Sequence, residues 1–497
     1  MKKFKILSTA WIVNPSLRFI QRFNSIKILS AALLLATFVS CRKELLDANI
    51  DPNVSGTAQP DYLLSNAIKS TSDTYWGTTN NLNGTLLFVQ HVAKIQYTEV
   101  DRYIFSNADF ESPWKSFYAQ SLTDLNKIIE LGQKSNNPNY KSVGLILRSW
   151  VFSLLTDAYG DIPYSEAISI DNHITPKYDA QQDVYHGILN DLKVASDSID
   201  PTGKPISGDI IYSGNLTKWK HFANSLRYRI ALRIADREPQ LSKQIISEIP
   251  VSQLIGDGEI AQLIYLVSPN QNPISQFFET RDDYRVSKSI VETLKSLNDP
   301  RLAIYANTTE TVTPEQYIGV PNGLSNSDAS ALGFSRTSKI GSYFRQPQAP
   351  AVILSYAEVL FDRAEAAARG FTNENAEDLY NQAITASLKQ YGVTDNTVIA
   401  NYLAQPSVKY DLTNYRKSIG NQKWIALFGQ GLEAFAEWRR LDYPVLTPAA
   451  AGVLNGKIPL RYIYPGSEQS LNSKSYKAAI AHQGDDLLTT KLWFDLN

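Results

Sequence analysis

The chain has 497 residues, of which 43% are hydrophobic and 20% charged, an ordinary composition for a globular protein. Its 48 Lys and Arg residues nearly balance its 49 Asp and Glu residues. Binding to nucleic acid requires a basic surface that neutralises phosphates, so this balance argues against a general nucleic-acid-binding protein. The single cysteine excludes an intrachain disulfide and a cysteine-based zinc site. The five histidines are scattered, and no HExxH, phosphate loop or GxSxG occurs, so we expect neither a metal nor a cofactor.

The first forty residues match a secretion signal. A basic leader precedes an uncharged run over residues 28–39, "ILSAALLLATFV", which is shorter than the ~20 residues of a bilayer-spanning helix. Ser40 and then Cys41 follow, the order of a bacterial lipoprotein signal. We therefore predict a signal peptide over residues 1–40, acylation of Cys41, and a polar tether over residues 41–60 that attaches the protein to the membrane. The alternative is an ordinary signal peptide with an incidental cysteine.

The body, residues 61–497, is predicted to be mostly α. Apolar residues recur at three- and four-residue steps, which indicates amphipathic helices joined by short turns. This pattern predicts antiparallel, tetratricopeptide-like helix pairs over about 111–238 and 352–440. Clusters of Pro, Asn, Ser and Gly predict a loop-rich insert over about 240–350. The expected helices cover residues 114–129, 143–158, 184–199, 219–234, 353–368, 376–391 and 422–439.

Aromatic residues are unusually frequent, with 27 Tyr, 19 Phe and 8 Trp. Aromatic rings fill cores, but exposed rings also form flat apolar surfaces with polar edges. The tryptophans on the periodic apolar faces are assigned to the core because the helices must bury those faces. They are Trp114, Trp150, Trp219, Trp424 and Trp438.

Two groups of carboxylates allow a chemical or a structural interpretation. Glu358, Asp362 and Glu365 share one helix face, and paired carboxyl groups can cleave a glycosidic bond. A stripe of arginines at four-residue steps on another helix offers ion-pair partners, which favours a structural role. The second group lies in "TDAYGDIPYSEA", which lacks the ligand spacing of a calcium loop and is interpreted as a turn. The arginines are Arg229, Arg233 and Arg237, and the second group is Asp157, Asp161 and Glu166.

Several phrases, in this order, resemble the SusD/RagB family of outer-membrane nutrient-binding lipoproteins, and more narrowly its second SusD-like branch. They cover nearly all of the body, and together they are far more specific than any one of them alone. They are "LLTDAYGDIPYSEA" (154–167), "GNLTKWKHFANSLRYRIALRIA" (214–235), "NDPRLAIYA" (298–306), "LSYAEVLFDRAEAAARG" (354–370), "QKWIALFGQGLEAFAEWRR" (422–440) and "LWFDLN" (492–497).

The resemblance implies four tetratricopeptide-like helix pairs that carry a loop-rich second half. It also implies a lipid-anchored protein at the cell surface that forms a lid on a TonB-dependent outer-membrane transporter. The cargo in such a family is an oligosaccharide or, in some members, a peptide.

A sugar site needs exposed aromatic rings beside amide, carboxylate or guanidinium groups, because sugar rings have apolar C–H faces and paired hydroxyls. The stretch "DTYWGTTNNLNG" (73–84) supplies this mixture and lies outside the clear scaffold helices. We therefore predict ligand contacts from its two rings and three amides. These residues are Tyr75, Trp76, Asn80, Asn81 and Asn83.

The resemblance also implies ligand aromatics in later loops of the second half. "FFETRDDYR" (277–285) and "GSYFRQPQ" (341–348) are the candidates. The residues predicted to contact ligand there are Phe278, Arg281, Tyr284, Tyr343 and Arg345.

These observations predict a non-enzymatic, cell-surface glycan-binding lipoprotein that delivers oligosaccharide to a TonB-dependent transporter. Three alternatives remain open at this point. The cargo could be a peptide, the protein could be a surface glycoside hydrolase that uses Glu358 and Glu365, or it could be a structural lid without a ligand of its own.

Overall fold

The computed structural model describes residues 58–167 and 173–496. The compact unit that begins at Gln59 contains every helix and strand named below. The expected signal peptide and Cys41 lie outside the described residues, as does nearly all of the expected tether. Within 58–167 and 173–496, no helix is both long enough and apolar enough to cross a membrane.

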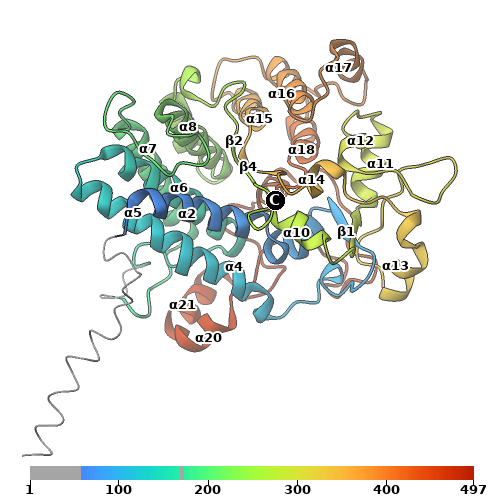
Figure 1. The fold of residues 1–497 in the computed structure, drawn as a ribbon, viewed down its shortest axis with the longest axis horizontal. Coiled ribbons are helices and arrows are strands. Elements are labelled where there is room, and N and C mark those ends of the chain that lie inside the picture. The colour runs from blue at the N-terminus through green and yellow to red at the C-terminus, as the bar shows by residue number, and fades with distance from the viewer. Residues whose placement is uncertain (1–57, 168–172, 497) are drawn as a thin grey trace, which may run out of the picture. The chain divides into compact units, whose positions relative to one another are not determined.

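Helices dominate the first part of the body (Figure 1). Helix α6 shows how the local sequence sets their bounds. Pro138 occupies its first turn, where an absent N–H costs nothing, and Asn139 N–H donates to the Asn137 side chain at 3.1 Å. Gly160, at φ +88°, ends the helix. The elements are α2 (Pro60–Trp76), the π-helical η1 (Thr78–Thr85), α3 (Leu86–Phe88), β1 (Val92–Lys94), η2 (Val100–Arg102), η3 (Asn107–Phe110), α4 (Glu111–Ser116), the π-helical η4 (Phe117–Leu122), α5 (Thr123–Lys134), α6 (Pro138–Tyr159), α7 (Gln181–Ser198) and α8 (Leu216–Arg233).

The segment expected to be rich in loops contains short helices and two small sheets. Strand β1 pairs antiparallel with β3, which places Val92 opposite Val286. Strand β2 pairs antiparallel with β4, which places Leu263 opposite Ala351. The β1–β3 pairing ties this segment back to the N-terminal part of the body. The elements are α9 (Pro239–Ser247), η5 (Val251–Gln253), β2 (Ala261–Ile264), α10 (Pro273–Phe278), β3 (Tyr284–Val286), α11 (Lys288–Ser296), α12 (Leu302–Tyr305), α13 (Asn326–Leu332), η6 (Phe334–Arg336), α14 (Ser342–Arg345) and β4 (Pro350–Leu354).

The last part of the chain is again helical. The single helix expected over residues 422–439 is wrong, because the chain turns at Gly429 and forms two helices instead. Gly429 has a φ of +91°, which L side chains rarely adopt, and a Cβ there would lie 3.0 Å from the Trp76 ring. The elements are α15 (Tyr356–Ala368), α16 (Ala376–Gln390), α17 (Asn396–Leu403), α18 (Tyr415–Ala426), α19 (Gly431–Leu441), α20 (Gly466–Leu471) and α21 (Ser473–Gln483).

Four helix pairs form the scaffold, the number that the family resemblance implies. They are α5–α6, α7–α8, α15–α16 and α18–α19, and each pair packs closely. Helix α8 also packs on α15, and α6 packs on α19, so the early and late pairs share one core. In Figure 1 the early pairs lie at the left and α15, α16 and α18 at the top, while α10, α14 and β1 lie from the centre toward the right. The mostly α, tetratricopeptide-like fold class is therefore confirmed.

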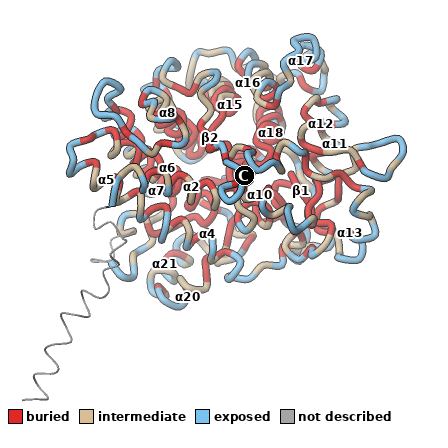
Figure 2. Tube along the Cα trace, viewed as in Figure 1, coloured by how far each residue is buried: buried red, intermediate tan, exposed pale blue. Residues whose placement is uncertain are grey.

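The core follows the helix faces that the tryptophans mark. Figure 2 shows buried chain concentrated where the helix pairs meet, with exposed chain mainly in the connecting turns. The predicted core placement holds for Trp114, Trp150, Trp219 and Trp424, which are buried. Trp438 is partly buried at the edge of the core, where its Nε1 donates to the carbonyl oxygen of Pro444 at 3.0 Å.

Buried ion pairs cross this core. The three carboxylates of α15 are fully enclosed, and each has a cationic partner on another helix, which confirms their structural interpretation. Lys423 on α18 also contacts Glu437 on α19, at 2.8 Å. The partners and separations are Glu358 with Arg229 (2.7 Å), Asp362 with Lys423 (2.5 Å) and Glu365 with Arg440 (2.6 Å).

Arg233 on α8 is the central cation of this network. Its guanidinium contacts Glu433 and Glu437, both at 2.6 Å, and lies 3.4 Å from Asp157 of α6. Burial alone would raise the pKa of Glu437, but nearby cations, Arg440 first among them, hold it well below its usual range. The third arginine of the predicted stripe, Arg237, instead lies over the Trp493 ring.

We expect Arg233→Ala to lower the free energy of unfolding by roughly 3–5 kcal/mol, because it leaves buried carboxylates without their cation. Urea unfolding followed by circular dichroism measures this change. Lys193→Ala is the matched control, because its pair with Asp197 is exposed and should contribute less than about 1 kcal/mol. Equal effects of the two substitutions would contradict the assigned role of the network.

His91, between α3 and β1, is the one buried histidine among the described residues. Its ring lies 5.2 Å from both Trp424 and Phe428, and Nε2 is 3.0 Å from the Trp424 carbonyl oxygen. The neutral ring therefore donates from Nε2, and Nδ1 has no hydrogen-bond partner. Burial lowers the pKa of His91 to about 3, because a charged imidazolium would be desolvated.

This lowered pKa predicts a loss of stability in acid. Between about pH 3 and the unfolded pKa near 6.5, the unfolded chain binds the additional proton, so stability falls as the pH falls. From pH 7 to pH 5, His91 should remove roughly 2 kcal/mol of unfolding free energy. We expect the pH dependence of urea unfolding to be shallower by that amount in His91→Gln; identical slopes would refute the assignment.

Candidate ligand-binding site

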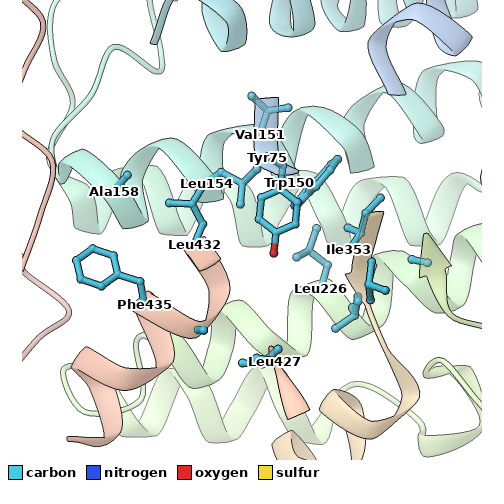
Figure 3. Packing of buried hydrophobic residues seen from close by; sticks show 14 of the residues in the cluster. Tyr75, Trp150, Val151, Leu154, Ala158, Leu226, Ile353, Leu427, Leu432 and Phe435 are labelled. Carbon is cyan, nitrogen blue, oxygen red and sulfur yellow. The ribbon is translucent and has the colours of Figure 1, made fainter. Parts of the chain in front are cut away.

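The two aromatic residues of the first predicted cluster lie in the hydrophobic core. Tyr75 and Trp76 form the last turn of α2, where Trp76 is 2% exposed and its Nε1 donates to the Val352 carbonyl oxygen at 3.3 Å. Figure 3 shows Tyr75 pointing inward beside Trp150, with Leu154 and Leu432 nearby. The expectation that these rings lie on an exposed loop is wrong. A ring that stacks on sugar must be open to solvent, and here the core covers both.

The asparagines of η1 have mainly structural partners. Asn81 is buried, and it accepts a hydrogen bond from Gly431 N–H and donates to the Gly429 carbonyl oxygen, both at 3.0 Å. It thereby fixes the turn between α18 and α19. Asn80 is also buried; its main-chain carbonyl oxygen accepts from the Tyr462 hydroxyl at 2.7 Å, while its side-chain Nδ2 has no hydrogen-bond partner. Asn83 is half-buried and accepts a hydrogen bond from the hydroxyl of Tyr284, which connects η1 to the second predicted cluster.

The residues of the second cluster come together. Helix α10 packs against α14, although 63 residues separate the ends of the two helices. The Arg345 guanidinium carbon lies 5.9 Å from the centre of the Phe278 ring. Phe277 contacts both Phe278 and Tyr284 edge-on, with ring centres 5.4 Å apart in each case. Tyr343 is the exception: it is half-buried on α14, and its ring contacts those of Phe344 and Tyr391 instead of the other predicted residues.

Tyr97 belongs to the same site, although the sequence analysis missed it. Its side chain is 58% exposed, and the Arg281 guanidinium carbon lies 5.1 Å from its ring centre. The same carbon lies 6.0 Å from the centre of Phe277. The sequence offers one faint signal, an aromatic residue in the polar stretch "QYTEVDR" (96–102). We refer to Tyr97, Phe277, Phe278, Arg281 and Arg345 as the aromatic surface.

Buried polar groups hold Arg281 in place. Asp283 accepts hydrogen bonds from Arg281 and from Gln96 Nε2, the latter at 2.8 Å, and lies 3.5 Å from Lys94 Nζ. Burial would raise the pKa of Asp283, but the hydrogen bonds from Arg281 and Gln96 and the charges of Lys94 and Arg281 together lower it. Tyr284 is fully buried beneath the aromatic surface, where Lys94 Nζ lies 4.4 Å from its ring centre. Tyr284 therefore supports the surface and does not present its ring to solvent.

The geometry of the aromatic surface suits a sugar chain. Tyr97 is exposed, Phe277 and Phe278 are half-exposed, and apolar C–H faces can stack on such rings. Guanidinium N–H groups beside the rings can donate to hydroxyl or carboxylate oxygens.

Asn80 lines a separate polar pocket of about 280 Å³, which is formed mainly by hydroxyl-bearing residues of α2, η1 and α4.

The carboxylates considered for chemistry have other roles. Glu358 is 1% exposed and Glu365 is 0% exposed, and both are ion-paired, so neither can flank a sugar bond. The hydrolase hypothesis for this pair is therefore wrong. The carboxylates of the "TDAYGDIPYSEA" turn do not converge on one point. Asp161 accepts from Gln181 N–H at 2.9 Å, Glu166 accepts from Lys177 N–H at 2.9 Å, and Asp157 accepts from the Tyr185 hydroxyl at 2.5 Å.

A family model described as "Starch-binding associating with outer membrane" matches residues 52–465. The chain belongs to this SusD-like family. The resemblance seen in the sequence is therefore confirmed, and the family consists of binding proteins and not of enzymes. No curated protein sequence matches this chain.

Solved structures agree with this family. A chitin-binding protein shares 29% sequence identity with a TM-score of 0.81, and the match covers 88% of this chain and 100% of that one. A chitin-binding SusD homologue from Flavobacterium johnsoniae shares 25% identity with a TM-score of 0.79, covering 88% and 98%. A SusD homologue from Bacteroides uniformis shares 25% identity with a TM-score of 0.78, covering 88% and 100%.

Proposed function

We propose that this protein is a non-enzymatic glycan-binding protein of the outer membrane that captures oligosaccharide on the aromatic surface. The observation that carries the proposal is the group of open rings at Tyr97, Phe277 and Phe278, with two arginine side chains over them. The family description names starch binding and an outer-membrane association, and two similar structures are described as chitin-binding.

We expect the aromatic surface to bind a glycan with moderate affinity. The rings offer contact area, and Arg281 is held by Asp283, so little side-chain entropy is lost when a ligand binds. The surface remains partly hydrated, however, and water bridges take the place of many direct contacts. Weak binding of a long glycan suits a protein that must release its cargo.

We expect Tyr97→Ala to weaken binding of the preferred glycan at least about fivefold, roughly 1 kcal/mol, because a stacking ring is removed. Calorimetry of the body from Gln59 onward, titrated with chitin and starch oligosaccharides, measures the change, and Phe278→Ala should act in the same direction. The control is Tyr62→Ala, since Tyr62 is 74% exposed at the start of α2. Glycan binding that survives both substitutions would place the glycan elsewhere, and binding of peptides alone would favour peptide cargo.

Delivery to a TonB-dependent transporter completes the proposal. Lipid on Cys41, joined to the body by the tether of residues 41–60, would keep the protein at the outer-membrane surface beside such a transporter. The protein would then act as a lid that passes the bound oligosaccharide into the transporter.

The anchor can be tested in a bacterium with a lipoprotein pathway. We expect Cys41→Ser to move the protein from the membrane fraction to the soluble fraction, because the acylated thiol is lost. Intact-mass measurement of the wild-type chain should show an N-terminal cysteine that carries lipid. Ser40→Ala keeps a small residue before the cysteine and should remain lipidated. A Cys41→Ser protein that stays in the membrane fraction would contradict the proposed anchor.

A further inference from the structure

Arg345 differs from the other cations around the aromatic surface. It closes the one-turn helix α14, and its Nε donates to the Ile340 carbonyl oxygen at 2.6 Å. Among the described residues, neither of its Nη groups has a hydrogen-bond or ion-pair partner. The guanidinium lies over the Phe278 ring, with Cζ 5.9 Å from the ring centre, so its free N–H groups stand at the edge of the aromatic surface.

The neighbouring cations are already neutralised. Each has at least one carboxylate within ion-pair distance; of these carboxylates Asp283 is buried, Asp282 is half-buried and Glu310 is exposed. The pairs are Arg281 with Asp283, Arg285 with Asp282 (2.9 Å) and Lys339 with Glu310 (2.8 Å). The exposed Glu279, which follows α10, accepts from Gln271 Nε2 at 2.7 Å and does not pair with Arg345. Asp282 and Glu310 act on Arg345 through their charge but make no ion-pair contact with it, so Arg345 is the cation of the aromatic surface that has no ion-pair partner among the described residues.

An unpaired guanidinium in this position has an energetic consequence. Arg345 is half-buried, and its desolvation lowers its pKa below the usual range of arginine. A partly desolvated cation gains more from an anion than a solvated one, because it has already lost part of its hydration. Its planar N–H groups match two oxygens of a carboxylate or sulfate. Arg336, by contrast, is exposed on η6 and well hydrated.

We propose that the aromatic surface selects acidic glycans, with Arg345 binding a carboxylate or a sulfate ester on the sugar while the sugar ring stacks beside it. This inference rests on the proposed function and specifies its substrate class. Phe278 lies under the guanidinium, so one sugar residue can use the ring and the free N–H groups together. Arg281, which Asp283 holds, is left to donate to hydroxyls.

Pairs of glycans that differ only in their acidic groups show how much of the affinity depends on charge. The probes are heparosan and polygalacturonate oligosaccharides, each compared with its neutral, carboxyl-reduced form, and a chondroitin 4-sulfate oligosaccharide, compared with its desulfated, its carboxyl-reduced and its doubly treated, neutral form. Calorimetry of the body from Gln59 onward measures each affinity. We expect at least one acidic form to bind tenfold or more tightly than its neutral counterpart. A loss of affinity after carboxyl reduction identifies the carboxylate as the bound group, and a loss after desulfation identifies the sulfate.

Two substitutions test the residue itself. Arg345→Met keeps an apolar side chain over Phe278 and should reduce the acidic preference to within about twofold, while binding of the neutral form is unchanged. Arg336→Met removes the same charge from an exposed site and should leave the preference intact. Circular dichroism melting confirms that both variants are folded.

Three other results of these experiments would contradict the inference about Arg345, the proposed function, or both. If neutral forms bind as tightly as acidic forms and Tyr97→Ala still weakens them, the inference about Arg345 fails and the proposed function stands. If Arg345→Met and Arg336→Met reduce acidic binding equally, the preference reflects overall charge and the inference also fails. If no glycan of these pairs binds, and chitin and starch oligosaccharides do not bind either, the proposed function fails together with the inference.

Discussion

The ion pairs between α8, α15, α18 and α19 are the constraint on which the rest of the structure depends. Arg233 reaches Glu433 and Glu437 on α19, so the early helix pairs are joined to the last one through charges with almost no access to water. Buried charges are expensive to leave unpaired, and a shifted helix would leave several unpaired at once. The network therefore fixes the register in which the four pairs pack, and this packing decides where the connecting segments emerge.

The aromatic surface depends on that scaffold. It is built from short elements that come from three distant parts of the chain: the loop after β1, helix α10 and helix α14. The β1–β3 pairing and the packing of α10 on α14 bring these parts together. Beneath the surface, Tyr284 and Asp283 hold its rings and Arg281 from below. A site of this kind tolerates changes in its exposed side chains, because its position is set by residues that do not touch the ligand.

The scaffold could be predicted from the sequence because helix periodicity is local. Residues at three- and four-residue steps reveal a buried face without knowledge of what covers it. Trp76 shows where such reasoning fails. The motif of residues 73–84 is polar and rich in asparagine, yet its first four residues are the last turn of α2, and Trp76 lies on the buried face of that helix with Leu64, Ile68 and Tyr75. Tyr97 shows the reverse failure, since an exposed ring in a short loop has no periodicity that could reveal it. Phe278 and Arg345 were selected through family resemblance, and only the three-dimensional packing shows that they meet.

The hydrogen bonds between Asn81 and the turn that joins α18 to α19 have a consequence for the synthesis of the chain. Its two hydrogen bonds join positions 348 and 350 residues apart, and the Trp424 indole reaches back 335 residues to the Val89 carbonyl oxygen. Contacts between such distant parts of a chain form late and slowly, since a long loop must close before they are gained. Helix α2 emerges from the ribosome early, but the residues that cover Trp76 and Asn81 are made near the end. A chain made only to residue 428 therefore lacks both partners of the Asn81 side chain and the glycine turn that packs on Trp76.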